Sequence, residues 1–145
     1  MLLPNGVRLI PDESLLVVAD TVLRTAWSFH IRPDGSLVNG EPFYHLEIPD
    51  DVNNGPLRSG ADGMAFDDQG HLYVATKVGI QICDQAGRVV GIIRNPGAHD
   101  PSNVVFGGAD LKTLYCTSGD KVYKRQLRRK GVFPWQPVKL PRPQL

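Results

Sequence analysis

The chain has no apolar run near the roughly 20 residues that a membrane-spanning helix needs, although 41% of its 145 residues are hydrophobic. Its first residues, MLLPNGVRLIPDES, hold no basic segment followed by a long apolar stretch, so they do not read as a signal peptide. Helical periodicity is absent throughout. We therefore expect a soluble domain with no membrane role, and the compartment stays undetermined.

Cysteine is scarce, with two residues in the chain. Cys83 lies in GIQICD and Cys116 in TLYCTS, and in such apolar, strand-like runs a thiol acts as a small hydrophobic side chain. We predict that both are core residues. A disulfide between them, or a reactive thiol, is the alternative.

Basic residues are few in the first 110 positions, which hold seven Lys or Arg against fourteen Asp or Glu, whereas residues 111–145 hold nine against one. The segment KVYKRQLRRKG, residues 121–131, has the charge to attract nucleic acid. Basic residues on a last edge strand also prevent unwanted sheet pairing, and we favour this interpretation. The sequence thus predicts no nucleic-acid partner.

Three stretches of the sequence share one order of features, and they begin at Asn5, Asp62 and Asn103. A polar residue precedes a short apolar strand, then a turn rich in Gly, Pro or Asp, then a second strand such as LYVAT. Third strands follow at 25–31, 79–84 and 121–127, and the first two units add a fourth at 42–48 and 88–94. Gly35 and Gly87 mark the hairpin turns before these fourth strands.

Repeated four-stranded antiparallel units of about 40 residues are typical of β-propeller blades. The last two units start 41 residues apart and the first two 57 apart, with most of the difference in a loop at 48–61. We predict an all-β, propeller-type fold in which residues 1–127 form three blades and residues 128–145 a Pro-rich basic tail. Three blades do not close a ring, because propellers have about four to eight.

The first strand of each propeller blade lines the central channel, so residues at one position of the repeat meet around the axis. Asn5, Asp62 and Asn103 share this position in our alignment of the repeats, and their oxygens would suit a divalent cation. The alternative is that each residue bonds only its local backbone. Asp20, at the end of a second strand, would either border the site or brace its own loop.

The segments PNGVRLIPDESLLVVADT, GADGMAFDDQGHLYVATKVGIQICDQAGRVVGII and PSNVVFGGADLKTLYCTS resemble the last three blades of the SMP-30/gluconolactonase/luciferin-regenerating family. The resemblance covers about residues 3–127. It implies a six-bladed propeller that holds one divalent cation, Ca²⁺ or Zn²⁺ for example and Mg²⁺ or Mn²⁺ as further candidates, and that hydrolyses lactones. It also implies that Asn5 and Asp62 are metal ligands, that Asp62 is a candidate catalytic base, and that Asn103 borders the site.

Several family site residues are missing from this chain, because the family's glutamate ligand, a further channel asparagine and a substrate-binding arginine belong to blades that it lacks. Either the chain is a C-terminal fragment whose N-terminal blades complete the ring, or two copies join as half-propellers. The resemblance implies a gluconolactonase-like hydrolase that acts on a small lactone. A non-catalytic propeller module that binds a partner or a structural ion is the alternative.

Overall fold

A computed structural model describes residues 1–50, 57–133 and 136 of the chain, and this part is built entirely from strands, turns and loops. No helix occurs among these residues, and hence none that is long and apolar enough to cross a membrane. The strands are β1 (Pro4–Leu9), β2 (Leu15–Asp20), β3 (Thr25–Ile31), β4 (Leu37–His45), β5 (Met64–Phe66), β6 (Leu72–Thr76), β7 (Gly79–Cys83), β8 (Val89–Ile93), β9 (Pro101–Gly107), β10 (Thr113–Ser118) and β11 (Lys121–Gln126).

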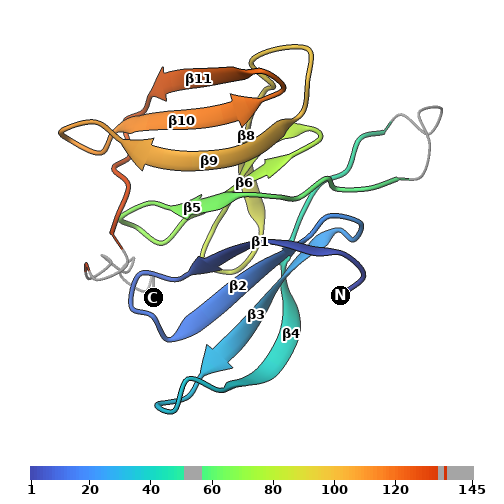
Figure 1. Ribbon diagram of the computed structural model, residues 1–145, viewed down its shortest axis with the longest axis vertical. Coiled ribbons are helices and arrows are strands. Elements are labelled where there is room, and N and C mark those ends of the chain that lie inside the picture. Colours follow the sequence, from blue (N-terminus) through green and yellow to red (C-terminus); the bar gives the residue numbers. More distant parts are fainter. Residues whose placement is uncertain (51–56, 134–135, 137–145) are drawn as a thin grey trace, which may run out of the picture.

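The strands form three antiparallel sheets, each in chain order. The first sheet holds β1–β4 and the second β5–β8, whereas the third holds only β9–β11. Figure 1 shows the three sheets in a row, with the second between the other two. The prediction of an all-β fold with three blade-like sheets is confirmed, and the third sheet lacks a fourth strand in the described part of the chain.

The hairpins within the first two sheets turn where glycine allows a positive φ. Gly35 has a φ of 81° and Gly87 a φ of 80°. A residue without a Cβ adopts this conformation at little cost in free energy. In the first turn the Arg32 N–H donates to the Ser36 carbonyl (2.9 Å). Because this turn is tight, β4 begins at Leu37, earlier than the fourth strand predicted at 42–48.

The second sheet is buried on both faces, because successive side chains of a strand point to opposite sides. Met64 and Val74 belong to a core cluster shared with the first sheet, which contributes residues such as Val17. Ala65 and Tyr73 belong to a second cluster, shared with residues of the third sheet. Strands β5, β6 and β7 of the middle sheet are therefore buried almost throughout, whereas β3 and β10 of the outer sheets alternate between buried and half-buried residues over most of their length.

Both cysteines are buried free thiols, as the sequence predicts. Cys83 lies in the cluster between the first and second sheets, and Cys116 in the cluster between the second and third. Burial, followed by the charge of Asp84, raises the pKa of the Cys83 thiol to about 12. A thiol with such a pKa is protonated at neutral pH and is a poor nucleophile.

The segment after β11 does not leave the sheets at residue 128, where the sequence predicted a tail. The Gly131 N–H donates to the Leu111 carbonyl (2.8 Å), and the Asp68 N–H donates to the Lys130 carbonyl (2.8 Å). Val132 is 8% exposed and joins the first core cluster. The predicted boundary is therefore too early by several residues, and most of the Pro-rich stretch lies outside the described residues.

Two glycines allow the innermost strands of neighbouring sheets to touch. A methyl group added to Gly6 would overlap the backbone carbonyl of Asp62, and one added to Gly63 would overlap the side chain of Asn103. The Gly63 N–H also donates to the carbonyl of Ser102 in β9 (2.9 Å). These contacts hold the ends of the three inner strands together.

Replacing Gly63 with alanine should therefore destabilise the fold, although alanine is the smallest possible change. The new methyl group would lie 2.7 Å from Asn103 Cα, too close without movement of the backbone. We expect a loss of about 1–3 kcal/mol in the free energy of unfolding, typical of overpacking, measured by urea denaturation.

The matched control is Gly91→Ala in β8, where the nearest atom to an added methyl group is Ile82 Cδ1 at 3.8 Å. This variant should be as stable as the wild type or slightly more so. Equal urea midpoints for Gly63→Ala and Gly91→Ala would contradict the close contact between Gly63 and Asn103.

Candidate functional site

Each inner strand carries a β-bulge at its first residues, where it enters the sheet. The β1–β2 pairing shifts register between Pro4 and Val7, and the β9–β10 pairing shifts beside Thr117. Just before β5, the Asp62 N–H donates to the Ala75 carbonyl while the Ala75 N–H donates to the Gly63 carbonyl (3.0 Å each). Two residues then oppose one, and bulges of this kind re-aim side chains and often lie beside functional sites.

The bulges correct the alignment of the three repeats. Asn5 and Gly6 oppose the residue between Val18 and Asp20 of β2, in the way that Asp62 and Gly63 oppose Ala75. In the third sheet the corresponding pair is Ser102 and Asn103, because Thr117 is paired with Asn103 and Ser118 with Pro101.

The prediction that Asn103 is the third member of the set with Asn5 and Asp62 is therefore wrong by one residue, and Ser102 holds that position. Asn103 takes the position of the glycines. Its side chain still lies against Gly63, so it borders the end of β5 that carries Asp62. A bulge inserts a residue without any signal in the hydrophobic pattern, which is why the polar residues alone could not set this register.

Asn5 is held by contacts that leave its amide oxygen for a ligand. Its Nδ2 group donates to Thr21 Oγ1 (3.2 Å), and its side chain hydrogen-bonds Asp62. Thr21 in turn donates to the carbonyl of Ala61 (2.9 Å), which ties the first sheet to the approach of β5. Since a carboxylate only accepts, Nδ2 is the donor to Asp62 as well, and Asn5 Oδ1 remains available.

Asp62 is half-buried, with its backbone fixed by the bulge. Burial raises the pKa of its carboxyl group above the ordinary value of 3.8, and the hydrogen bond from Asn5 offsets only part of this effect. The described residues place no Lys or Arg in an ion pair with it. A partly desolvated carboxylate without a cationic partner favours a proton or a bound cation.

Asn103 is exposed, and its Oδ1 accepts the backbone N–H of Val104 (2.9 Å). This local bond is the type that the alternative interpretation of the sequence expected. The structure therefore places Asn103 at the border of Asp62 and gives its oxygen a backbone partner.

Asp20 braces the chain rather than the site. It is fully buried, and its carboxylate accepts four backbone N–H groups, from Leu2 (2.6 Å), Leu3 (3.3 Å), Val22 (3.0 Å) and Leu23 (3.1 Å). Burial alone would raise its pKa, but these four bonds outweigh it and hold the pKa below 3.8. Of the two roles predicted for Asp20, the structure supports the bracing one.

The oxygen ligands around Asp62 are of the type that a hard cation prefers, but they are too few to hold one. Within the described ranges no three His, Cys, Asp or Glu side chains lie close enough together to hold a metal ion. One carboxylate and the Asn5 amide oxygen are the kind of ligands that Ca²⁺ prefers, yet Ca²⁺ takes six to eight oxygens. These two side chains therefore supply too few oxygen ligands to hold such an ion by themselves.

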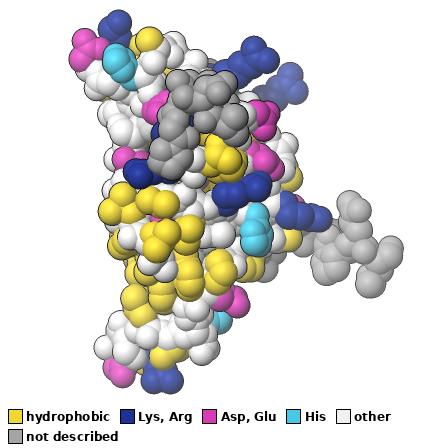
Figure 2. All heavy atoms as spheres, turned by 90° about the vertical axis from the view of Figure 1, so that its right-hand side faces the viewer, with side chains coloured by type: hydrophobic (Ala, Val, Ile, Leu, Met, Phe, Trp, Pro, Cys, Tyr) yellow, Lys and Arg dark blue, Asp and Glu magenta, His cyan; other side chains and the backbone are white. Residues whose placement is uncertain are grey.

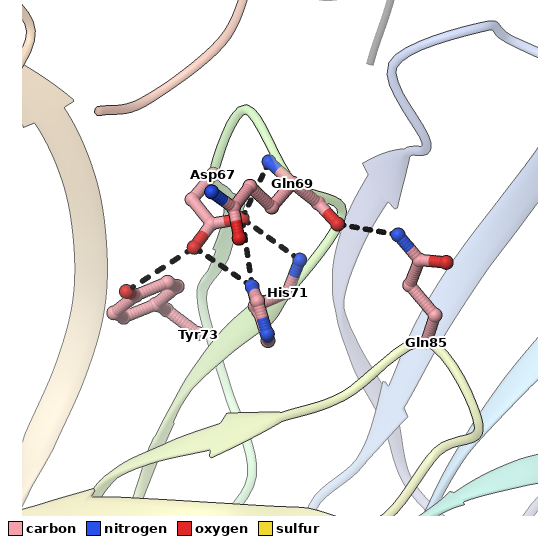
Figure 3. Close-up of polar contacts among 5 residues, drawn as sticks. All are labelled: Asp67, Gln69, His71, Tyr73 and Gln85. Atoms are coloured by element: carbon pink, nitrogen blue, oxygen red, sulfur yellow. Dashed lines mark hydrogen bonds and ion pairs between the residues drawn. The ribbon is translucent and has the colours of Figure 1, made fainter. Parts of the chain in front are cut away.

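Asp67 forms a second polar cluster, at the opposite end of β5, whose extent the sequence did not predict. Asp67 stabilises the turn after β5, because its Oδ1 accepts the backbone N–H groups of Gln69 and His71 (2.9 Å each). Asp67 is also fully buried, pairs with His71 Nδ1 (3.0 Å) and accepts the Tyr73 hydroxyl (3.5 Å) (Figure 3). Every contact in this cluster stabilises the β5–β6 hairpin.

Comparison with known proteins shows where this arrangement of strands occurs. The family model for the SMP-30/gluconolactonase/LRE-like region matches residues 1–120. The chain belongs to this family. Of the curated relatives, a gluconolactonase of Zymomonas mobilis is 28% identical over 130 residues, which cover 88% of this chain and 36% of that protein.

Two solved structures related to the family place the three sheets within a larger fold. A gluconolactonase of Xanthomonas campestris superposes with a TM-score of 0.67 at 30% identity, over 86% of this chain and 37% of that one. A calcium-binding regucalcin of Agrobacterium tumefaciens superposes with a TM-score of 0.72 at 20% identity, over 94% and 49%. The chain thus spans between about a third and a half of the length of these relatives.

Asp62→Asn should stabilise the metal-free protein at pH 7, because burial of the ionised carboxylate costs free energy that a neutral amide avoids. The folded-state pKa is raised, so this cost is present above that pKa and disappears as the pH falls through it. We expect the melting temperature of Asp62→Asn to exceed that of the wild type at pH 7, with the difference vanishing towards pH 3.

An NMR titration of the Asp62 carboxyl carbon measures directly whether the pKa of Asp62 is raised. Asn5→Ala removes the one bond that lowers the Asp62 pKa, so it should raise that pKa further. A pKa at or below 3.8 in the wild type would contradict the assignment.

Asp20→Ala should destabilise the fold, because it leaves four partly buried backbone N–H groups without their carboxylate partner. We expect a loss of about 3 kcal/mol in the free energy of unfolding at pH 7. Since its folded-state pKa is lowered, the Asp20 contribution is present at neutral pH and is lost as the pH falls through that pKa.

The control for Asp20 is Asp34→Ala, an exposed turn carboxylate that accepts the Ser36 N–H (2.9 Å). Its loss should shift the denaturation midpoint far less than the loss of Asp20 does, as is usual for surface sites. Similar denaturation midpoints for the two variants would show that Asp20 does not brace the N-terminal residues.

Proposed function

We propose that the protein is a lactonase whose reaction centre is built around Asp62. The observation that carries the proposal is the half-buried Asp62 carboxylate, with a raised pKa, beside Asn5 at the point where the inner strands meet. Two of the relatives named above are gluconolactonases, which supports lactone hydrolysis as the reaction class. Because the chain spans less than half of those relatives, the activity is that of a completed ring.

A divalent cation fits the donor set in part, and Ca²⁺ and Zn²⁺ are the candidates that oxygen ligands allow. Asp62 and the Oδ1 atom of Asn5 would hold it, with the remaining ligands supplied from outside this chain. The calcium-binding regucalcin among the similar structures supports the choice of Ca²⁺. When bound, the cation would supply polarisation of the lactone carbonyl.

The chain's own residues would then position and deprotonate water. Asp62 accepts a proton from the water whose oxygen attacks the lactone carbonyl carbon, as a general base does. The ring C–O bond breaks, and the proton goes to the leaving alkoxide, which yields a hydroxy acid. Asn5 orients the Asp62 carboxylate through its Nδ2 group, and Ser102 and Asn103 line the border.

Metal binding and turnover test the proposal separately. Calorimetric titration of the chain with CaCl₂ or ZnCl₂ should show binding that Asp62→Ala abolishes. Opening of gluconolactone or a homoserine lactone should stop in EDTA and fall at least about 100-fold in Asp62→Ala, the usual loss when a general base is removed.

Asp68→Ala is the matched control, because Asp68 is a half-buried aspartate in the turn after β5 and lies outside the site. Its metal affinity and turnover should equal those of the wild type. Metal binding without turnover would favour a non-catalytic module that binds a structural ion, and the absence of both would remove the site as proposed.

A further inference from the structure

The outer face of the first sheet is apolar and is partly exposed to solvent. Val17 and Ala19 of β2 face the second sheet, so their neighbours Leu16 and Val18 face the other way. Cross-strand pairing places Val7, Leu9, Trp27 and Phe29 on the same outer side. Val7 is 60% exposed, and the Trp27 and Phe29 rings stack with their centroids 6.5 Å apart.

The third sheet has an outer face as well, at the other end of the row. Val104 and Cys116 pack against the second sheet, so Val105, Tyr115 and Val122 point outward. Val105 is 53% exposed and Val122 is 69% exposed. The middle sheet, in contrast, is covered by a sheet on each side, and nearly all of its β6 and β7 residues are buried.

Charge distinguishes the two end sheets. Residues 1–47, which include the first sheet, hold six Asp or Glu and three Lys or Arg, whereas residues 101–130, which include the third, hold two and seven. Figure 2 shows hydrophobic side chains gathered on the lower half of the visible face, the half that holds the first sheet in Figure 1. An acidic end with an apolar face therefore complements a basic end of the same chain.

We propose that a second copy of the chain covers these faces, so that the first sheet of each copy packs on the third sheet of the other. Two such contacts close a two-fold ring of six sheets, a symmetric and self-limiting assembly. The chain covers between 36% and 49% of the length of the relatives and similar structures named above, so a fold of their size has room for further sheets beside these three.

The ring bears on the site proposed above, and only this step rests on the proposed function. A second Asp62, Asn5 and Ser102 would converge on the same axis and double the number of oxygen ligands. The partial donor set of one copy would then approach the six to eight oxygens that Ca²⁺ takes.

The test is the mass of the chain by sedimentation equilibrium, in EDTA and in CaCl₂. We expect twice 15.9 kDa at micromolar concentration in both solutions. Val7→Glu and Val105→Glu should each weaken the dimer by about 30-fold or more, since each buries a charge in an apolar interface. Val90→Glu is the control, because Val90 is 59% exposed on β8 and lies on neither end face.

A monomer at all these concentrations would overturn the proposal, and the end faces would then belong to other blades. A dimer that only Val7→Glu weakens would also overturn it, because the first sheets would then pair with each other. Failure of the lactonase proposal would leave the dimer in EDTA unchanged, so the two failures are distinguishable.

Discussion

The close contact between the inner strands of neighbouring sheets is the constraint on which the rest of the structure depends. Gly6 lies against the carbonyl of Asp62, and Gly63 lies against Asn103, at distances that admit no side chain. These contacts set the sheets side by side, so that the middle sheet is buried on both faces. They also carry Asp62 into the angle between the strands, where it loses part of its hydration.

Two carboxylates of this chain show how the environment raises or lowers the pKa of a buried group. Asp20 is fully buried, yet four backbone N–H groups stabilise its charge and lower its pKa. Asp62 is less buried, but only Asn5 compensates it and its pKa is raised. The first carboxylate is satisfied by the fold, whereas the second has no partner charge among the residues that the structure describes. A cation bound beside Asp62 would therefore be stabilised by a carboxylate charge that the fold does not compensate.

The three sheets end in two faces of different character, and this has consequences for stability. Valines that are more than half exposed on β1, β9 and β11 occupy places that a neighbouring sheet covers in the middle of the row. Covering them removes apolar surface from water, which stabilises any assembly that supplies a sheet. The same assembly would bring further oxygen ligands to the inner strands. If both proposals hold, stability and completion of the site are linked.

The sequence by itself determined most of the strands, the three repeats and the hairpin glycines, because alternation of side chains and turn chemistry are local properties. Only the tertiary structure decided the rest. The bulges replaced Asn103 by Ser102 in the repeat, since an inserted residue leaves no mark on hydrophobic alternation. The burial of Asp67 and the packing of residues 128–133 depend on contacts between segments far apart in the chain, and such contacts exist only once the sheets have assembled.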